Sequence, residues 1–368
     1  MRTFERPQTP AGAKTLDAVW YTSAEIFADE CRRIFSRSWV AAGREAQIAN
    51  AGDYFLLEIA DESLIVTRDG AGQLHAFYNV CRHRGTRLCE QRSGHFRSTI
   101  QCPYHAWTYG LDGSLRVARN MEGSEGFDCA DYPLREARIA VFEGFIFVCL
   151  DETAPSIAQT FAPLDGRFSA WQLPALHAPT RIVYDVAANW KLIFQNYSEC
   201  YHCPIIHPQL EKLSPSDSGR NDFTEGPFLG GYSRLRDGKA LSTTGLSTRM
   251  PLGSISGEEL ERTYYYTIFP SLLLSLHPDY AMAHYVTPLA PDRTRIVCEW
   301  LFAQAEVDRP DFDGADVVEF WDLTNRQDWR VNELTQQGVS SRAYSPGPYA
   351  VQEGLLHAFD RYYLTLMA

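Results

Sequence analysis

Residues 81–86 have the sequence CRHRGT, and residues 102–109 have the sequence CPYHAWTY. Each stretch offers one cysteine and one histidine, which gives four potential metal ligands: Cys81, His83, Cys102 and His105. Two thiolates and two neutral imidazoles suit an asymmetric two-iron cluster, in which the sulfurs hold one iron and the imidazoles hold the other. Zinc also binds Cys2His2 sets, but its usual motifs pair cysteine with cysteine and histidine with histidine. We therefore expect an iron–sulfur cluster, with zinc as the alternative.

The sequence around these motifs predicts a small β domain. At 368 residues, of which 45% are hydrophobic, the chain is long enough for two cores. Short β-like runs separated by glycine and aspartate turns extend from about residue 54 to residue 150, and both motifs fall between such runs. The motifs are therefore expected on two loops that converge at one end of a β-sandwich. The expected strands are 55–59, 64–67, 74–78 and 145–150.

The second half of the chain predicts a mixed α+β domain, in which helices cover an antiparallel sheet. Its expected strands are 181–186, 264–269, 272–276, 281–288 and 294–301, and its expected helices are 189–201 and 316–337. A further short helix is expected at 24–35. We place the boundaries at 1–40 for an amino-terminal arm, 41–155 for the β domain and 156–368 for the α+β domain.

Composition excludes several classes of partner. The net charge of −12 and the lack of a long basic run argue against nucleic-acid binding. The apolar runs are too short to cross a membrane, and the amino-terminal residues do not resemble a signal peptide. Nine cysteines without an export signal suggest reduced thiols, so we expect a cytoplasmic protein.

A second group of metal-ligating residues follows the expected helix 189–201. His202 and His207 lie five residues apart, and Asn196 and Glu199 precede them as further candidates for the catalytic site. Two histidines with one carboxylate from elsewhere form a face that leaves coordination positions open, as an iron(II) centre that uses dioxygen requires. Glu199 lies one helical turn before His202, so it can face the same site or bind the imidazole from outside.

Helical periodicity supplies a candidate for the missing carboxylate. Asp328 falls on the inward stripe of the expected helix 316–337, where an unpaired carboxylate is costly to bury and a metal ion would compensate its charge. Three alternatives stay open at this site. The histidines can be ordinary buried residues, or Cys200 and Cys203 can form a redox dithiol or a zinc site with His202. If iron is bound, we expect the two cysteines to be packed thiols.

The two motifs closely resemble those of the Rieske [2Fe-2S] family. The run NWKLIFQNYSECYHCPIIH at 189–207 and the run QDWRVNELTQQG at 327–338 are similar to the catalytic domain of Rieske non-haem iron oxygenases, in their alpha subunit. The resemblance covers nearly the whole chain. It implies a Rieske β-sandwich domain followed by a helix-grip-like catalytic domain, against which the amino-terminal arm packs. It also implies two cofactors, a [2Fe-2S] cluster and one mononuclear Fe(2+).

The resemblance also implies roles for individual residues. His202, His207 and Asp328 would hold the mononuclear iron. Glu199 would bridge to a cluster histidine of the neighbouring subunit, His83 or His105, in a head-to-tail homotrimer. Most ring-hydroxylating members carry aspartate at this position, whereas glutamate is similar to what oxygenases of choline, carnitine and betaines carry.

The electrons are expected to come from another protein. The sequence contains no flavin or nicotinamide fingerprint, so NAD(P)H would be used indirectly, through a separate reductase with or without a ferredoxin. The other substrates are dioxygen and a small organic molecule.

The resemblance is strongest to the branch that attacks C–H bonds beside nitrogen, which implies monooxygenation with N-demethylation or N-dealkylation. The carboxy-terminal run GPYAVQEGLLHAFDRYYL at 347–364 also resembles that branch. A quaternary ammonium group favours an aromatic cage. The candidate pocket residues are Tyr264, Tyr265, Tyr266, Leu274, Leu276, Trp300 and Phe302. Hydroxylation or dihydroxylation of an aromatic compound is the alternative within enzymes, and a non-catalytic Rieske electron carrier is the alternative outside them.

Overall fold

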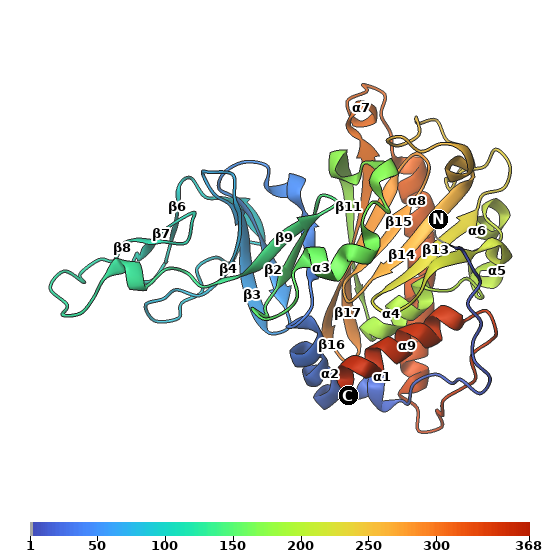
Figure 1. Ribbon diagram of the computed structural model, residues 1–368, viewed down its shortest axis with the longest axis horizontal. Coiled ribbons are helices and arrows are strands. Elements are labelled where there is room, and N and C mark those ends of the chain that lie inside the picture. Colours follow the sequence, from blue (N-terminus) through green and yellow to red (C-terminus); the bar gives the residue numbers. More distant parts are fainter. Residues whose placement is uncertain (1–2) are drawn as a thin grey trace. The chain divides into compact units, whose positions relative to one another are not determined.

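The computed structural model describes residues 3–368, which form two compact units. The small unit spans Phe35–Pro163. The large unit combines the amino-terminal residues up to Ile34 with Leu164–Ala368. Most elements of both are labelled in Figure 1.

The small unit contains a seven-stranded antiparallel sheet with the order β1-β10-β9-β4-β3-β2-β5. Its strands are β1 (Val40–Arg44), β2 (Asp53–Ile59), β3 (Glu62–Arg68), β4 (Leu74–Tyr78), β5 (Ser93–His95), β9 (Glu136–Phe142) and β10 (Phe145–Cys149). A three-stranded sheet, β6-β7-β8, consists of β6 (Thr99–Gln101), β7 (Thr108–Gly110) and β8 (Leu115–Val117). A short helix, α3 (Ile157–Phe161), ends the unit.

One hydrophobic core connects the two sheets of the small unit. Ile65 and Phe77 of the larger sheet pack in the same buried cluster as Ile100 and Tyr109 of the smaller sheet. The four side chains are at most 1% exposed. The loop after β4 and the β6–β7 hairpin are anchored in this core, so the expected β-sandwich with two loops is confirmed.

The large unit is built on a second seven-stranded antiparallel sheet, with the order β11-β17-β16-β15-β14-β13-β12. Its strands are β11 (Leu176–Val186), β12 (Arg220–Glu225), β13 (Phe228–Arg234), β14 (Arg262–Ile268), β15 (Leu272–Leu276), β16 (Ala281–Ala290) and β17 (Arg293–Ala303). Nearly every residue of β14 and β15 is buried, because both faces of the sheet are covered.

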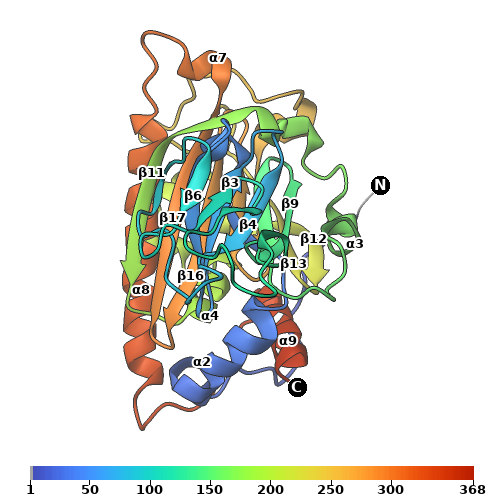
Figure 2. The same ribbon diagram turned by 90° about the vertical axis from the view of Figure 1, so that its left-hand side faces the viewer.

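The longest helix, α8 (Ala315–Val339), runs alongside β11 (Figure 2). It packs against α4 (Trp190–Tyr197), which in turn contacts α9 (Gly354–Met367) and β16. The remaining helices are α1 (Val19–Thr22), α2 (Ala24–Glu30) with a π-helical turn at Cys31–Phe35, α5 (Cys203–Ile206), α6 (Pro208–Leu213) and α7 (Gln304–Val307). Among the described residues, none of these helices combines the length and hydropathy that a membrane crossing requires.

Helix α4 ends at Tyr197, four residues before the expected end at residue 201. The Glu199 carboxylate provides the reason, because it accepts hydrogen bonds from the backbone N–H groups of Tyr201 and His202. Such a local bond between side chain and backbone competes with helix continuation. The chain therefore turns at Ser198 and starts again as α5, which has Pro204 in its first turn.

A buried ion pair joins α2, α4 and α9. Lys191 donates to Glu30 Oε1 at 2.5 Å, and the two side chains are at most 1% exposed. The same carboxylate accepts from Trp190 Nε1 at 2.8 Å and from the Tyr363 hydroxyl at 2.6 Å. Glu30 is therefore fully hydrogen-bonded, as a buried charge requires. This network fixes the start of α4, whose far end leads into the second group of metal-ligating residues.

Removing one partner of this pair should be costly. Lys191→Ala leaves Glu30 buried without its cation, so we expect a loss of about 3–5 kcal/mol in the free energy of unfolding of the large unit. The double variant Glu30→Gln/Lys191→Met removes both charges and should recover most of this loss. Urea unfolding followed by circular dichroism measures both. Unchanged stability of Lys191→Ala would contradict the role given to the pair.

Asp360 of α9 should impose a pH dependence on stability. Burial raises its pKa to about 6, although Tyr349 and Gln195 donate hydrogen bonds to it. The folded chain thus holds the proton more tightly than the unfolded chain does, so stability falls as pH rises from about 4 to about 6. Asp360→Asn cannot ionise. It should match the wild type at pH 4 and exceed it by about 2–3 kcal/mol at pH 7.5. An equal difference at both pH values would show that Asp360 does not titrate in this way.

Candidate metal centres

The four potential ligands of the small unit lie on its two anchored loops. Cys81 and Cys102 are buried at 2% and 3% exposure, whereas His83 is exposed and His105 is partly exposed. The two imidazole rings lie 4.7 Å apart between centroids, and the His83 ring stacks on Trp107 at 4.8 Å. The sulfur ligands therefore sit inside the unit and the nitrogen ligands at its surface.

The two loops have the same backbone geometry. In each, the cysteine N–H donates to the carbonyl five residues later, at 2.8 Å from Cys81 to Thr86 and 2.8 Å from Cys102 to Trp107. The residue four after each cysteine donates back at 3.1 Å and has a positive φ, 75° at Gly85 and 57° at Ala106. Equivalent turns present the two Cys–His pairs in the same way, which suits a cluster held symmetrically by two loops.

Tyr109 contacts the first cluster loop, a role that its sequence context did not indicate. Its hydroxyl lies 3.3 Å from Cys81 Sγ and accepts from Arg82 N at 3.0 Å. Because the oxygen already accepts, its proton is free to point at the sulfur. Hydrogen bonds to cluster sulfurs raise the reduction potential.

The surroundings of His83 favour its neutral form. Desolvation, followed by the neighbouring His105 and Arg84, lowers the pKa of His83, which keeps this imidazole in the neutral form that binds metal.

In the large unit, three separate elements bring His202, His207 and Asp328 together. His202 lies in the turn before α5, His207 directly precedes α6, and Asp328 lies in the middle of α8. One ligand atom from each of the three residues lies within 4.8 Å of the others. Asp328 Oδ1 is 2.8 Å from His207 Nε2 and 3.3 Å from His202 Nε2.

Outer partners fix the tautomer of both histidines. His202 Nδ1 lies 2.5 Å from Glu199 Oε1, and His207 Nδ1 lies 2.8 Å from Gln327 Oε1. Carboxylate and amide oxygens only accept, so each Nδ1 carries a proton and each Nε2 is directed at Asp328, where it can donate a proton or bind a metal ion. Gln209 Nε2 donates to the same oxygen of Gln327 at 3.0 Å, which holds that amide in place. Such outer partners are typical of metal-ligating histidines.

The charges at this site favour a cation. Burial alone would raise the pKa of Asp328, but hydrogen bonds with His202 and His207 hold it below its usual value. Burial likewise opposes protonation of His202, yet hydrogen bonds with Asp328 and Glu199 raise its pKa to about 10. Two carboxylates thus retain positive charge on the imidazole between them. A divalent ion can take the place of that proton, so the donor set fits a two-histidine, one-carboxylate iron site.

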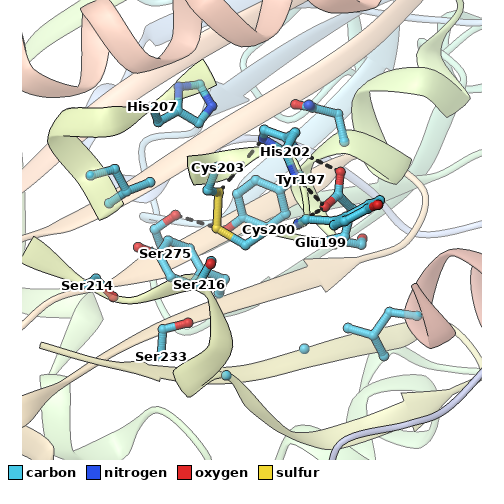
Figure 3. A pocket seen from close by; sticks show the side chains of 18 of the residues that line it. Tyr197, Glu199, Cys200, His202, Cys203, His207, Ser214, Ser216, Ser233 and Ser275 are labelled. Carbon is cyan, nitrogen blue, oxygen red and sulfur yellow. Dashed lines mark hydrogen bonds and ion pairs between the residues drawn. A yellow bond between two sulfur atoms is a disulfide. The ribbon is translucent and has the colours of Figure 1, made fainter. Parts of the chain in front are cut away.

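Cys200 and Cys203 are joined by a disulfide, as Figure 3 shows. This differs from the expectation that they are packed thiols. The short turn between α4 and α5 places their Cα atoms 5.0 Å apart, within the range that a disulfide requires.

A cavity of about 200 Å³ adjoins the three ligand residues. Glu199 and Asn196, the remaining candidates for the catalytic site, also line it. The tyrosine and tryptophan residues that line it come from α4, the turn after it, β13, β14 and α8. They are Tyr197, Tyr201, Tyr232, Tyr265, Trp321 and Trp329. His284 and Asn325 form a polar part of the wall, where Asn325 Oδ1 lies 3.3 Å from His284 Nε2. The volume is below that of typical drug-sized sites and indicates a small ligand.

Most of the expected pocket residues lie elsewhere. Side chains alternate along a strand, so Tyr265 and Ser275, which pair directly, share the face that lines the cavity. Tyr264 and Tyr266 of β14 therefore point to the opposite face, where they contact Trp171 and Phe168. Leu274 and Leu276 face the same way as these tyrosines. Trp300 shares the face of Tyr265 but does not line the cavity, and Phe302 does not line it either.

Comparison with known proteins identifies both halves of the chain. Residues 38–133 match the Rieske [2Fe-2S] domain, and residues 173–368 match the ring hydroxylating alpha subunit (catalytic domain). The chain is 31% identical to the glycine betaine monooxygenase oxygenase subunit of Pseudomonas aeruginosa, over 95% of this chain and 88% of that protein. It is 30% identical to the carnitine monooxygenase oxygenase subunit of Escherichia coli K12, over 91% and 87%. A quaternary ammonium Rieske monooxygenase in complex with L-carnitine has a similar structure, with a TM-score of 0.78 and 26% identity over 96% of this chain and 95% of that one.

The ligand group predicts a selective loss of iron. Asp328→Ala should lower the iron content from about three to about two per chain, because the cluster keeps its own four ligands and its visible spectrum. Asp322→Ala is the matched control, since Asp322 lies on the same helix but accepts from the Tyr184 hydroxyl instead. Colorimetric iron analysis and absorption spectra measure both. If Asp328→Ala retained about three irons, the assigned ligand set would be wrong.

Proposed function

Because the chain belongs to the family of Rieske-type ring-hydroxylating oxygenase alpha subunits, we propose that it is the oxygenase component that N-demethylates or N-dealkylates a small quaternary ammonium compound. Hydroxylation of a carbon bound to nitrogen gives a hemiaminal, which breaks down to the dealkylated amine and an aldehyde. For an N-methyl group, the aldehyde is formaldehyde. The names of the similar proteins support this substrate class.

The small aromatic cavity beside the ligand residues is the observation that carries the proposal. A quaternary ammonium group has no hydrogen-bond donor and is held by the faces of aromatic rings. Tyr197, Tyr265 and Trp321 supply such rings within about 200 Å³. The charge of the Glu199 and Asp328 carboxylates, which line the same cavity, is balanced by His202 and the proposed iron. The aromatic faces attract a cation but give a neutral arene no such electrostatic gain, which favours a quaternary ammonium compound over the aromatic alternative.

The residues around the ligands orient and protect the site. Glu199 and Gln327 hold the two imidazoles from outside, so their Nε2 atoms converge with Asp328. A ferrous ion held there supplies open positions for dioxygen, and the Rieske cluster supplies electrons one at a time. The reaction needs a separate reductase, which takes electrons from NAD(P)H and passes them to the cluster directly or through a ferredoxin. Cys89, Cys129, Cys149 and Cys298 take part in no disulfide, which supports a reducing, cytoplasmic setting.

The surfaces near both sites support assembly of several copies. Tyr201 and Ile205, which follow Glu199, are 58% and 83% exposed, and Tyr104 in the second cluster loop is 56% exposed. Exposed apolar side chains beside functional groups are typical of interaction sites. In a head-to-tail homotrimer, His83 or His105 of one subunit would meet Glu199 of the next and carry electrons across that interface.

The substrate proposal is tested by product formation. With a reductase that reduces the cluster, glycine betaine, carnitine, choline, N-alkyl amides and simple arenes are compared for formaldehyde release and oxygen use. We expect formaldehyde from one or more of the quaternary ammonium compounds and no oxidation of the arenes. Oxidation of arenes alone would favour the aromatic alternative and overturn the proposal.

The charge of the substrate provides a sharper test. A carbon isostere, in which a tert-butyl group replaces the trimethylammonium group, keeps the shape but loses the charge. Recognition by aromatic faces predicts binding about 2- to 30-fold weaker, which corresponds to about 0.5–2 kcal/mol. Competitive inhibition constants give the ratio. An isostere that binds as tightly as the cation would exclude a role of charge in recognition.

Glu199→Gln probes the electron route. The amide keeps the size of the side chain but loses its charge, so we expect both metal sites to stay filled while turnover falls by about 10- to 100-fold. Glu211→Gln is the control, because Glu211 accepts from Ser216 N at 2.9 Å and does not line the cavity. Stopped-flow oxidation of the reduced cluster measures the electron step. Oxidation at the wild-type rate would remove Glu199 from the route.

A further inference from the structure

The Cys200–Cys203 disulfide lies in the wall of the cavity rather than in a remote loop. Both cysteines line the cavity together with Glu199, His202 and His207 (Figure 3). Cys203 is 3% exposed and Cys200 is partly exposed. The pair therefore borders the space in which dioxygen and substrate are expected.

The disulfide closes a ring around the proposed iron ligand His202. The ring contains only Tyr201 and His202 between the two cysteines, and Cys203 N donates to Cys200 O at 3.3 Å. Glu199 immediately precedes the ring and accepts from both backbone N–H groups inside it. Reduction of the disulfide to two thiols would thus release the backbone that positions both Glu199 and His202.

The sulfur of Cys203 is also close to the ligand atom itself. Cys203 Sγ lies 3.9 Å from His202 Nε2, the nitrogen that faces Asp328. As a free thiolate, this sulfur is a strong ligand for iron and can compete for an open position. In the disulfide it carries no charge and is no longer a thiolate ligand. The oxidised pair therefore both orders His202 and removes a competing ligand.

We propose that Cys200 and Cys203 form a redox-responsive pair that adjusts the mononuclear site. Hydrogen peroxide oxidises the two thiols to the disulfide and is reduced to two waters: H2O2 + 2 R–SH → R–S–S–R + 2 H2O. The peroxide arises in the same cavity when dioxygen takes up two electrons and two protons without reaching a substrate. A protein dithiol of the thioredoxin type restores the thiols and becomes a disulfide itself. Disulfides in a reducing compartment are commonly of this reversible kind.

The wild-type holoenzyme provides the first test. The protein is reduced with dithiothreitol, freed of reductant, treated with equimolar hydrogen peroxide, then denatured and alkylated for mass spectrometry. We expect the 200–203 peptide to change from two alkylated thiols to a disulfide, and to revert with dithiothreitol, while Cys129 stays alkylated. A pair that stays as thiols with peroxide, or that native-state dithiothreitol does not reduce, would overturn the proposal.

Iron retention provides the second test and rests on the ligand role proposed for His202. Transfer of ferrous iron from the mononuclear site to a chelator should be about 10-fold slower in the disulfide state than in the dithiol state. Cys200→Ser should lose iron at the faster rate in both conditions, and Cys129→Ser should respond to peroxide as the wild type does. Equal rates in the two redox states of the wild type would contradict the proposal. Neither test needs a substrate, so a failure of the dealkylation assay is distinguishable from a failure here.

Discussion

The ion pairs of the Asp328 carboxylate, which is 16% exposed, are the interaction on which the metal site of the large unit depends. A carboxylate in the interior needs compensating positive charge and hydrogen bonds. Here the compensation comes from His202 and His207, which lie 3.3 and 2.8 Å away. These histidines reach Asp328 only because α4 ends at Tyr197 and the following turn redirects the chain. The buried pair of Lys191 and Glu30 fixes the other end of α4.

Glu199 links the ligand residue His202 to the proposed electron route. Its carboxylate ends α4, orients His202 and lines the cavity. The same side chain therefore shapes the backbone and positions a metal ligand. The proposed transfer partner, a cluster histidine, lies at the surface of its own unit, because the two cysteine ligands are buried and the two histidine ligands are not. The arrangement suits a relay in which the cluster stays within reach of another molecule.

Much of this could be predicted from the sequence, for identifiable reasons. The cluster loops follow from two short motifs of mixed ligands, and Asp328 follows from helical periodicity together with the family resemblance; the comparisons confirm the family, the fold class and the two cofactors. The face of β14 that lines the cavity could not be predicted. Both faces of β14 and β15 are buried, so hydrophobicity does not distinguish Tyr264 from Tyr265. Gln327 and Tyr109 were missed because their partners come from distant segments. The Cys200–Cys203 bond was not expected, because a C-x-x-C spacing suits a dithiol, a zinc site or a disulfide equally well.

The most direct test of the account is a single turnover without a reductase. The holoenzyme is reduced chemically, freed of reductant and mixed with dioxygen and a quaternary ammonium substrate, while the cluster absorbance and formaldehyde are followed together. A relay between the two iron sites predicts that the cluster becomes oxidised and that formaldehyde appears in proportion to the reduced clusters. Oxidation of the cluster without any product from a substrate that binds would contradict the relay and leave only an electron carrier.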